Sequence, residues 1–323
     1  MAAALSRVDG RLSRTLPRPT YLFLRRRYYE ARVVVRRNPG RGRLLPDFIV
    51  FGAAKSGTTS LYGALGEHPF IEPCVAEDAQ FGNTKEVRFF DYNYSRGRDW
   101  YRSHFPLESS RRAFEIENGR PFLTGEGSPS YISNLWAPSR IRKMLPNVKL
   151  IAVLRNPVDR AYSHFRYSQR AGDDECESFA EAVEREEERL RAELGRMAAD
   201  PTYNSMKFGS WSYLARSRYA EQLERWLALF PREQFLFLKA EELFENPQQT
   251  LDATCRFLGL PPYRVQVDRL NVSPEHASMP SDVRQSLVDY FRPHNERLYE
   301  LIGNDFGWER DEPAVAASVG TGR

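Results

Sequence analysis

The chain has 323 residues, of which 41% are hydrophobic and 13% aromatic, enough for a substantial core in one large or two ordinary domains. Its net charge of +4 is unevenly distributed, because residues 1–43 carry about +10 and the remainder about −6. No run of 18 or more apolar residues predicts a transmembrane helix, and the N-terminus lacks the apolar core of a signal peptide. The three cysteines are far apart, which argues against a disulfide framework or a metal site and favours a reducing, cytoplasmic compartment; they are Cys74, Cys176 and Cys255.

The first 43 residues alternate arginine with short apolar groups, and two interpretations remain open. They form either a disordered leader or a basic arm that contacts an anionic membrane through Tyr21–Phe23 and Arg25–Arg27. Basic arms also bind nucleic acid, but no recognition module follows, so we expect no nucleic-acid partner.

The stretch from Phe48 to Leu65 predicts a phosphate-binding loop. An apolar run of strand length leads through Gly52 and Gly57 into a helix that places Leu61 and Leu65 on one face. Strand, glycine loop and helix start direct backbone N–H groups at an anion. The loop also offers a lysine and hydroxyls; the candidate ligands are Lys55, Ser56, Gly57, Thr58, Thr59 and Ser60.

This loop departs from the nucleotide-triphosphate pattern, in which the lysine directly follows the second glycine. Here Thr58 follows Gly57, and Lys55 lies inside the loop. A plain surface turn is the alternative.

Strands and helices alternate through the rest of the chain. This order predicts an α/β, three-layer, P-loop-type fold with a central, mostly parallel sheet. We expect one domain over residues 44–310 and a disordered tail over 311–323. Beyond the loop, the expected strands are 123–126, 148–154 and 234–238, the extended segment is 83–91, and the expected helices are 100–105, a helix ending at Met144, 157–170, 178–198, 213–230, 247–258 and 281–302.

Polar residues follow the most apolar strand at the sheet edge where open α/β folds bind ligands. Arg155 comes directly after Leu154, and Ser163 lies two turns into the following helix. An ion-pair role for Arg155 is the alternative. With the glycine loop, these residues indicate two separated phosphate sites.

Three motifs resemble those of sulfotransferases that use 3′-phosphoadenosine 5′-phosphosulfate (PAPS). Gly52–Leu61 resembles the family's 5′-phosphosulfate loop, and Ile151–Phe165 resembles its 3′-phosphate strand and helix. Lys85–Asp91 is similar to the Lys-Glu-Val-x-Phe-Phe-Asp segment of the heparan sulfate branch. Two further segments, Ser210–Pro231 and Pro293–Leu298, also resemble that branch. The likeness covers residues 46–308.

The resemblance implies a sulfuryl transfer from PAPS to a carbohydrate or glycolipid hydroxyl (or amine), leaving 3′,5′-adenosine bisphosphate (PAP), with no metal. It assigns Lys55 to the oxygen between sulfate and phosphate, residues 56–60 to the 5′-phosphate, and Arg155 and Ser163 to the 3′-phosphate. Glu86 is the candidate general base, with an ion pair to Lys85 or Arg88 as the alternative. Lys85, Arg88 and Asp91 are candidate acceptor-binding residues.

Departures from the pattern leave the acceptor open. The branch often has a lysine where this chain has Gly127, and Arg88 replaces a histidine. Two other enzyme classes remain as alternatives. A phenol or alcohol sulfotransferase would use a histidine base, and none of the five histidines has a matching position. A P-loop kinase would need a magnesium carboxylate, which is not evident. A binding module without activity is the remaining alternative.

Overall fold

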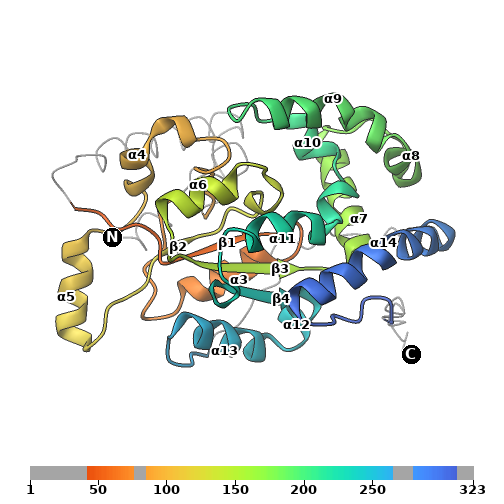
Figure 1. The fold of residues 1–323 in the computed structure, drawn as a ribbon. Helices are drawn as coiled ribbons and strands as arrows, with labels where there is room; N and C mark the ends of the chain where they lie inside the picture. The colour runs from red at the N-terminus through yellow and green to blue at the C-terminus, as the bar shows by residue number, and fades with distance from the viewer. Residues whose placement is uncertain (1–41, 76–84, 265–278, 311–323) are drawn as a thin grey trace, which may run out of the picture.

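The protein folds around a parallel sheet that helices cover on both faces (Figure 1). The computed structural model describes residues 42–75, 85–264 and 279–310. The strands lie in the order β2-β1-β3-β4, and every neighbouring pair is parallel. The strands are β1 (Phe48–Gly52), β2 (Gly125–Glu126), β3 (Lys149–Leu154) and β4 (Phe235–Lys239).

The helices arise from amphipathic stretches, and their bounds follow the sequence signals closely where caps are present. Asn156 caps one of them by accepting hydrogen bonds from the N–H groups of Val158 and Asp159, and Pro157 occupies the first position. The helices are α3 (Thr58–Gly66), α4 (Arg98–Arg102), α5 (Glu108–Asn118), α6 (Ala137–Met144), α7 (Pro157–Ala171), α8 (Phe179–Glu184), α9 (Glu186–Ala199), α10 (Met206–Trp211), α11 (Tyr219–Leu227), α12 (Ala240–Glu245), α13 (Pro247–Leu258) and α14 (Ser281–Ile302), with short 3-10 turns η1 (Tyr94–Arg96), η2 (Tyr131–Ser133), η3 (Ala215–Ser217) and η4 (Arg232–Gln234).

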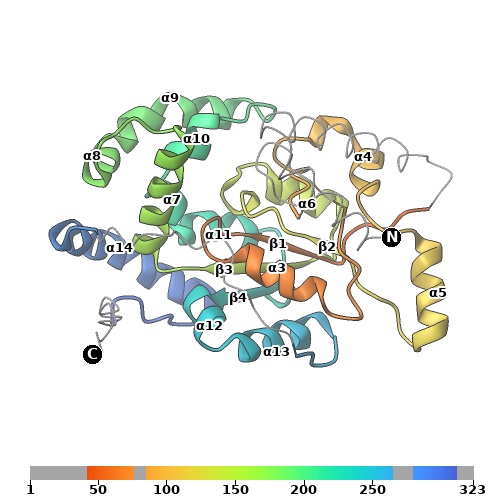
Figure 2. The ribbon, with the colours of Figure 1, turned by 180° about the vertical axis from the view of Figure 1, so that it is seen from behind.

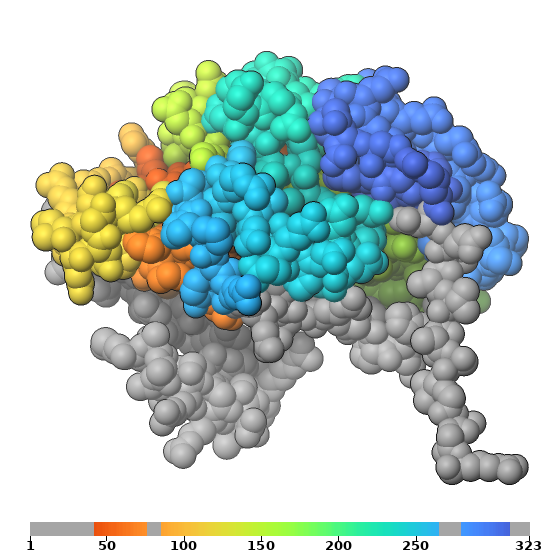
Figure 3. All heavy atoms as spheres, turned by 90° about the horizontal axis from the view of Figure 1, so that it is seen from below, coloured from red at the N-terminus to blue at the C-terminus, as the bar shows by residue number. Residues whose placement is uncertain are grey.

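The helices form the outer two layers. Helix α3 crosses the strands on the face seen in Figure 2, and α11 lies on the opposite face. Trp226 of α11 is fully buried, with its ring centroid 4.4 Å from that of Phe51 in β1. Seen from below, α12 and α13 cover the middle of the molecule, between α5 at one end and α14 at the other (Figure 3). The predicted α/β fold with a parallel sheet is therefore confirmed.

Three local predictions were wrong, and tertiary contacts explain the differences. The helix expected over 178–198 divides at Arg185 into α8 and α9, and the carboxylate of Glu186 turns inward to accept hydrogen bonds from Leu214 and Ala215. The helix expected from Tyr213 begins only at Tyr219, because the carbonyl of Tyr213 accepts a hydrogen bond from the buried Arg160.

The third difference concerns the extended segment expected over 83–91. Its described part, residues 85–91, contains no strand. Arg88 has a positive φ of 51°, so the chain turns there instead of running straight.

Candidate functional site

The loop between β1 and α3 has the conformation of an anion cradle. Gly57 precedes α3 with φ 88°, and within the described residues no side chain caps the helix start, so its first N–H groups face the loop. A Cβ atom at Gly57 would lie 2.8 Å from the ring of Phe244, so only glycine fits. Three of the expected ligands are buried and Thr59 is half-buried; the buried ones are Ser56, Thr58 and Ser60.

Lys55 points from this loop toward α7. Its Nζ lies 4.4 Å from the centre of the Tyr167 ring. Burial, together with the charges of Arg170, Arg155 and Arg160, lowers the pKa of Lys55 to about 8. This end of the sheet therefore gathers positive charge, which a phosphate or sulfate group would neutralise.

Arg155 ties the end of β3 to the same loop. Its Nη1 lies 3.4 Å from the carbonyl oxygen of Lys55, and its own carbonyl accepts a hydrogen bond of 3.0 Å from Tyr219. Ser163 lies half-buried on α7, the helix that starts just after Arg155. The structure thus places Arg155 next to the glycine loop. This is the position expected when two parallel strands end at the same edge of a sheet.

Glu86 reaches the loop through Lys85. The buried Lys85 amine lies 3.4 Å from Glu86 Oε1 and 3.5 Å from Thr58 Oγ1. The distance from Glu86 Oε1 to Thr58 Oγ1 in the glycine loop is therefore no more than the sum of these two distances. The ion pair that was the alternative for Glu86 is also present, so it does not distinguish the two roles.

Lys85 also fills the space beside Gly127. Its Nζ donates a 3.0 Å hydrogen bond to the Gly127 carbonyl, and a Cβ at Gly127 would lie 3.2 Å from Lys85 Cδ. A longer side chain at residue 127 would displace Lys85. The Lys85 amine, which the branch's own motif also carries, is thus the cation that lies beside Gly127.

Arg88 and Asp91 are paired with each other. Two guanidinium nitrogens donate to Asp91 Oδ2 over 2.9 and 3.1 Å, and Ser130 donates to the same oxygen. The other carboxylate oxygen accepts from the N–H of Tyr92. This pair fixes the turn that follows Glu86.

Glu126 is a buried carboxyl that sequence reasoning missed. It accepts 2.6 Å hydrogen bonds from Tyr101 and Ser128, and Tyr131 lies 3.3 Å away. Burial raises its pKa to about 7, against the lowering effect of these hydroxyl groups. Since Ser128 Oγ accepts from the N–H of Arg88, Glu126 holds the segment that carries Glu86. The signal in the sequence was a charged residue at the end of a short expected strand, 123–126.

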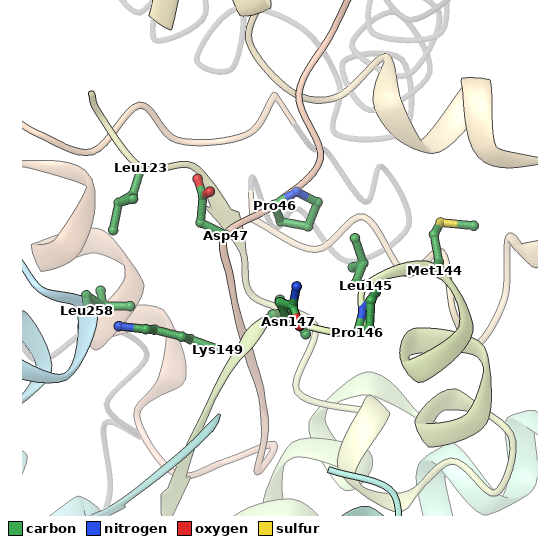
Figure 4. A pocket seen from close by; sticks show the side chains of 10 residues that line it. Pro46, Asp47, Leu123, Met144, Leu145, Pro146, Asn147, Lys149 and Leu258 are labelled. Carbon is green, nitrogen blue, oxygen red and sulfur yellow. The ribbon is translucent and has the colours of Figure 1, made fainter. Parts of the chain in front are cut away.

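A separate hollow lies at the opposite edge of the sheet (Figure 4). Its volume is about 400 Å³, and its lining includes Asp47, Asn147 and Lys149, which stand at the amino ends of β1 and β3. It is therefore remote from the glycine loop. In the described ranges, no group of three or more His, Cys, Asp or Glu side chains is placed to hold a metal ion.

Comparison with known proteins decides the family. The sulfotransferase domain model matches residues 45–280. This chain belongs to the sulfotransferase family. The sulfotransferase from Alicyclobacillus acidocaldarius, a solved structure, is 30% identical, with a TM-score of 0.58 over 83% of this chain and all of that one.

Curated relatives define the branch. Human heparan sulfate glucosamine 3-O-sulfotransferase 6 is 29% identical over 84% of this chain and 75% of its own length. The membrane-associated sulfotransferase kil1 of Dictyostelium discoideum is 28% identical over 84% of this chain and 68% of its own. The prediction of a PAPS-dependent sulfotransferase of the heparan sulfate branch is thus confirmed.

The described helices and the last residues of the basic arm bear on contact with a membrane. Across the described part of this sulfotransferase, no helix combines the length and apolarity needed to cross a bilayer. The basic arm lies outside the described residues except for its last two positions. Of these, Arg43 is buried and donates a 2.8 Å hydrogen bond to the carbonyl of Phe105.

Proposed function

We propose that this sulfotransferase moves a sulfuryl group from PAPS to a hydroxyl or amine of a carbohydrate or glycolipid, with Glu86 as general base. The observation that carries the proposal is the Lys85 amine, which lies within 3.5 Å of both Thr58 in the glycine loop and Glu86. A base this close to the loop can reach an acceptor oxygen aligned with a sulfate held there.

The donor would lie along the cationic edge of the sheet. Lys55 would contact the oxygen that links sulfate to the 5′-phosphate, and residues 56–60 would bind that phosphate through backbone N–H groups and hydroxyls. Arg155 and Ser163 would bind the 3′-phosphate, Arg155 through paired N–H groups. The cations that lower the pKa of Lys55 support this placement, because a multiply charged anion would neutralise them.

The transfer is a displacement at sulfur. As the acceptor oxygen forms its bond to sulfur, its proton passes to the Glu86 carboxylate, and the bond from sulfur to the bridging phosphate oxygen breaks. PAP leaves with the electrons of that bond, and Lys55 stabilises the charge that develops on the oxygen. Arg88 and Asp91 would orient the acceptor, while Lys85 would act through Glu86 and Thr58, since its amine points inward.

The relatives support a carbohydrate acceptor, since several are named as heparan sulfate sulfotransferases. A cytoplasmic location, and membrane contact through residues 1–43, are further parts of this proposal. Fractionation of the full chain and of a chain lacking residues 1–41, with anionic vesicles, tests that contact.

A binding and transfer assay tests the function. We expect calorimetry to show tight binding of PAP without metal and little binding of ATP with magnesium. Labelled sulfate from PAPS should then pass to glycans or glycolipids in a panel that also contains phenols. Preference for ATP would contradict the donor assignment, and transfer confined to phenols would contradict the acceptor assignment.

A further inference from the structure

The Lys55 amine lies among cations, with no carboxylate to hold it. Burial and the charges of Arg170, Arg155 and Arg160 all act against its charged form. In the part of the chain that the structure describes, this amine has neither an ion pair nor a hydrogen bond. A lysine side chain loses rotamer freedom when it is held, so a specific attraction is needed to keep the amine in one place.

The face of the Tyr167 ring supplies such an attraction. Lys55 Nζ lies 4.4 Å from the ring centre, and an ammonium within about 6 Å of that point is attracted to the negative face of the ring. The attraction is stronger where water is removed, and Lys55 is half-buried. The Tyr167 side chain is 39% exposed, so packing into the core does not explain its position.

Helix α7 is fastened on either side of Tyr167. His164 Nε2 lies 2.9 Å from the carbonyl oxygen of Gly209, and Ser168 Oγ donates a 2.8 Å hydrogen bond to the carbonyl of Ser210. These contacts attach the helix to α10 just before and just after Tyr167 in the sequence. The backbone that carries the ring is therefore fixed, and the lysine can rest against a surface that does not move.

Tyr167 also shares a face of α7 with proposed donor ligands. Ser163 lies one helical turn before it and Arg170 one turn after it, so the three side chains project from the same side of the helix. His164 interacts with Lys55 as well, but burial and the charge of Arg160 lower the pKa of His164 well below its usual value. His164 is therefore neutral and adds no charge beside the amine.

We infer that Tyr167 is a positioning residue for sulfuryl transfer, whose ring face holds the Lys55 ammonium beside the oxygen that links sulfate to phosphate. This inference rests on the proposed function, which gives Lys55 that contact. An ammonium has three N–H groups, so it can lie on a ring and still donate to a phosphate oxygen. The ring acts through Lys55 and counters the repulsion from the surrounding arginines before the donor binds.

A graded series of rings at residue 167 tests this role. Tyr167→Phe keeps the ring face and should transfer labelled sulfate at the wild-type rate. A phenylalanine with three ring fluorines at residue 167 has nearly the same shape but an electron-poor face, and Tyr167→Leu keeps only apolar cover. We expect single-turnover transfer to slow about tenfold in both, as the loss of a partly desolvated ring contact would give. Tyr290→Leu, which replaces a tyrosine of similar exposure on α14, is the control and should transfer normally.

The pH dependence of donor binding is a second measure, which a packing role would leave unchanged. The ring favours the charged amine, so its loss should lower the pKa of Lys55 below the wild-type value of about 8. The fall in PAP affinity with rising pH should then begin about one pH unit lower in the fluorinated variant and in Tyr167→Leu. It should begin at the wild-type pH in Tyr167→Phe.

Several results would overturn the inference. One is transfer by Tyr167→Leu at the wild-type rate or faster. Another is equal rates in the fluorinated variant and Tyr167→Phe, because packing alone would then account for the ring. A higher KM for the acceptor with an unchanged rate at saturation would assign Tyr167 to the acceptor instead. If the wild type failed to bind PAP at all, the proposed function itself would be wrong.

Discussion

On the proposed donor side of the site, Lys55, Arg155 and Arg160 form no ion pair within the residues described, and their charges act on one another. On the proposed acceptor side, the charges are matched: Lys85 contacts Glu86, and Arg88 is bonded to Asp91. Repulsion among these cations raises the free energy of the donor side when it is empty, and a bound anion would lower that free energy. Internal pairs instead hold the acceptor side in one geometry before any ligand arrives.

The comparison teaches that charge would serve two purposes within one site. Mutual repulsion at Lys55 favours binding of a multiply charged donor. Pairing around Glu86 would hold the proposed base in place without a ligand. Four experiments test whether this division of roles is correct.

The largest effect on turnover should come from a substitution on the acceptor side. We expect Glu86→Gln to lower turnover about 10³-fold, because general-base catalysis contributes 10² to 10⁴. PAP affinity should be unchanged, since the base does not bind the donor. Single-turnover transfer of labelled sulfate and calorimetry measure the two, with the exposed Glu67→Gln as control. Weakened PAP binding with intact turnover would instead give Glu86 a structural role.

The next largest effect, on the rate of sulfuryl transfer, should come from a substitution on the donor side. Lys55→Ala should slow transfer about 10²-fold, because a contact made to developing charge is worth about 3 kcal/mol. Lys143→Ala, on the exposed face of α6, is the matched control and should transfer at the wild-type rate. A Lys55→Ala enzyme that transfers normally would remove this lysine from the mechanism.

The buried carboxyl on the acceptor side should govern stability as the pH changes. The pKa of Glu126 is raised from 4.5 to about 7, so its contribution to folding is full below pH 4.5 and is lost as the pH rises through about 7. Over that window the wild type should lose up to about 3 kcal/mol relative to Glu126→Gln, which cannot ionise. Urea unfolding of both proteins at several pH values measures the difference. Parallel curves would mean that Glu126 does not titrate in this range.

The smallest effect concerns donor affinity. The pKa of Lys55 is about 8, so the amine is charged below pH 8 and loses its charge above it. PAP affinity should therefore fall as the pH rises past 8, by up to about tenfold per pH unit. Lys55→Ala should show no such fall. The same fall in the variant would assign the titration to another group.

Much of this architecture was predictable because it depends on local sequence. The apolar run of β1, the glycines of the loop and the amphipathic helix that follows each carry their signal within a few residues, as do the cap at Asn156 and the boundaries of α13 and α14. The approach of Arg155 to the loop followed from a general rule, since parallel strands end at one edge of a sheet.

Only tertiary structure decided how charges pair across the site. Lys85 meets Thr58 and Gly127, Glu126 meets Tyr101, and the Lys55 amine meets the Tyr167 ring, although these partners lie far apart along the chain. The same long-range contacts divided the expected helix at Arg185 and delayed α11 to Tyr219. The sequence by itself determined the family, the sheet and the glycine loop, because periodicity and motif spacing are local. Which cations are paired with carboxylates depended on packing, because electrostatic energy follows distance and burial in the folded chain.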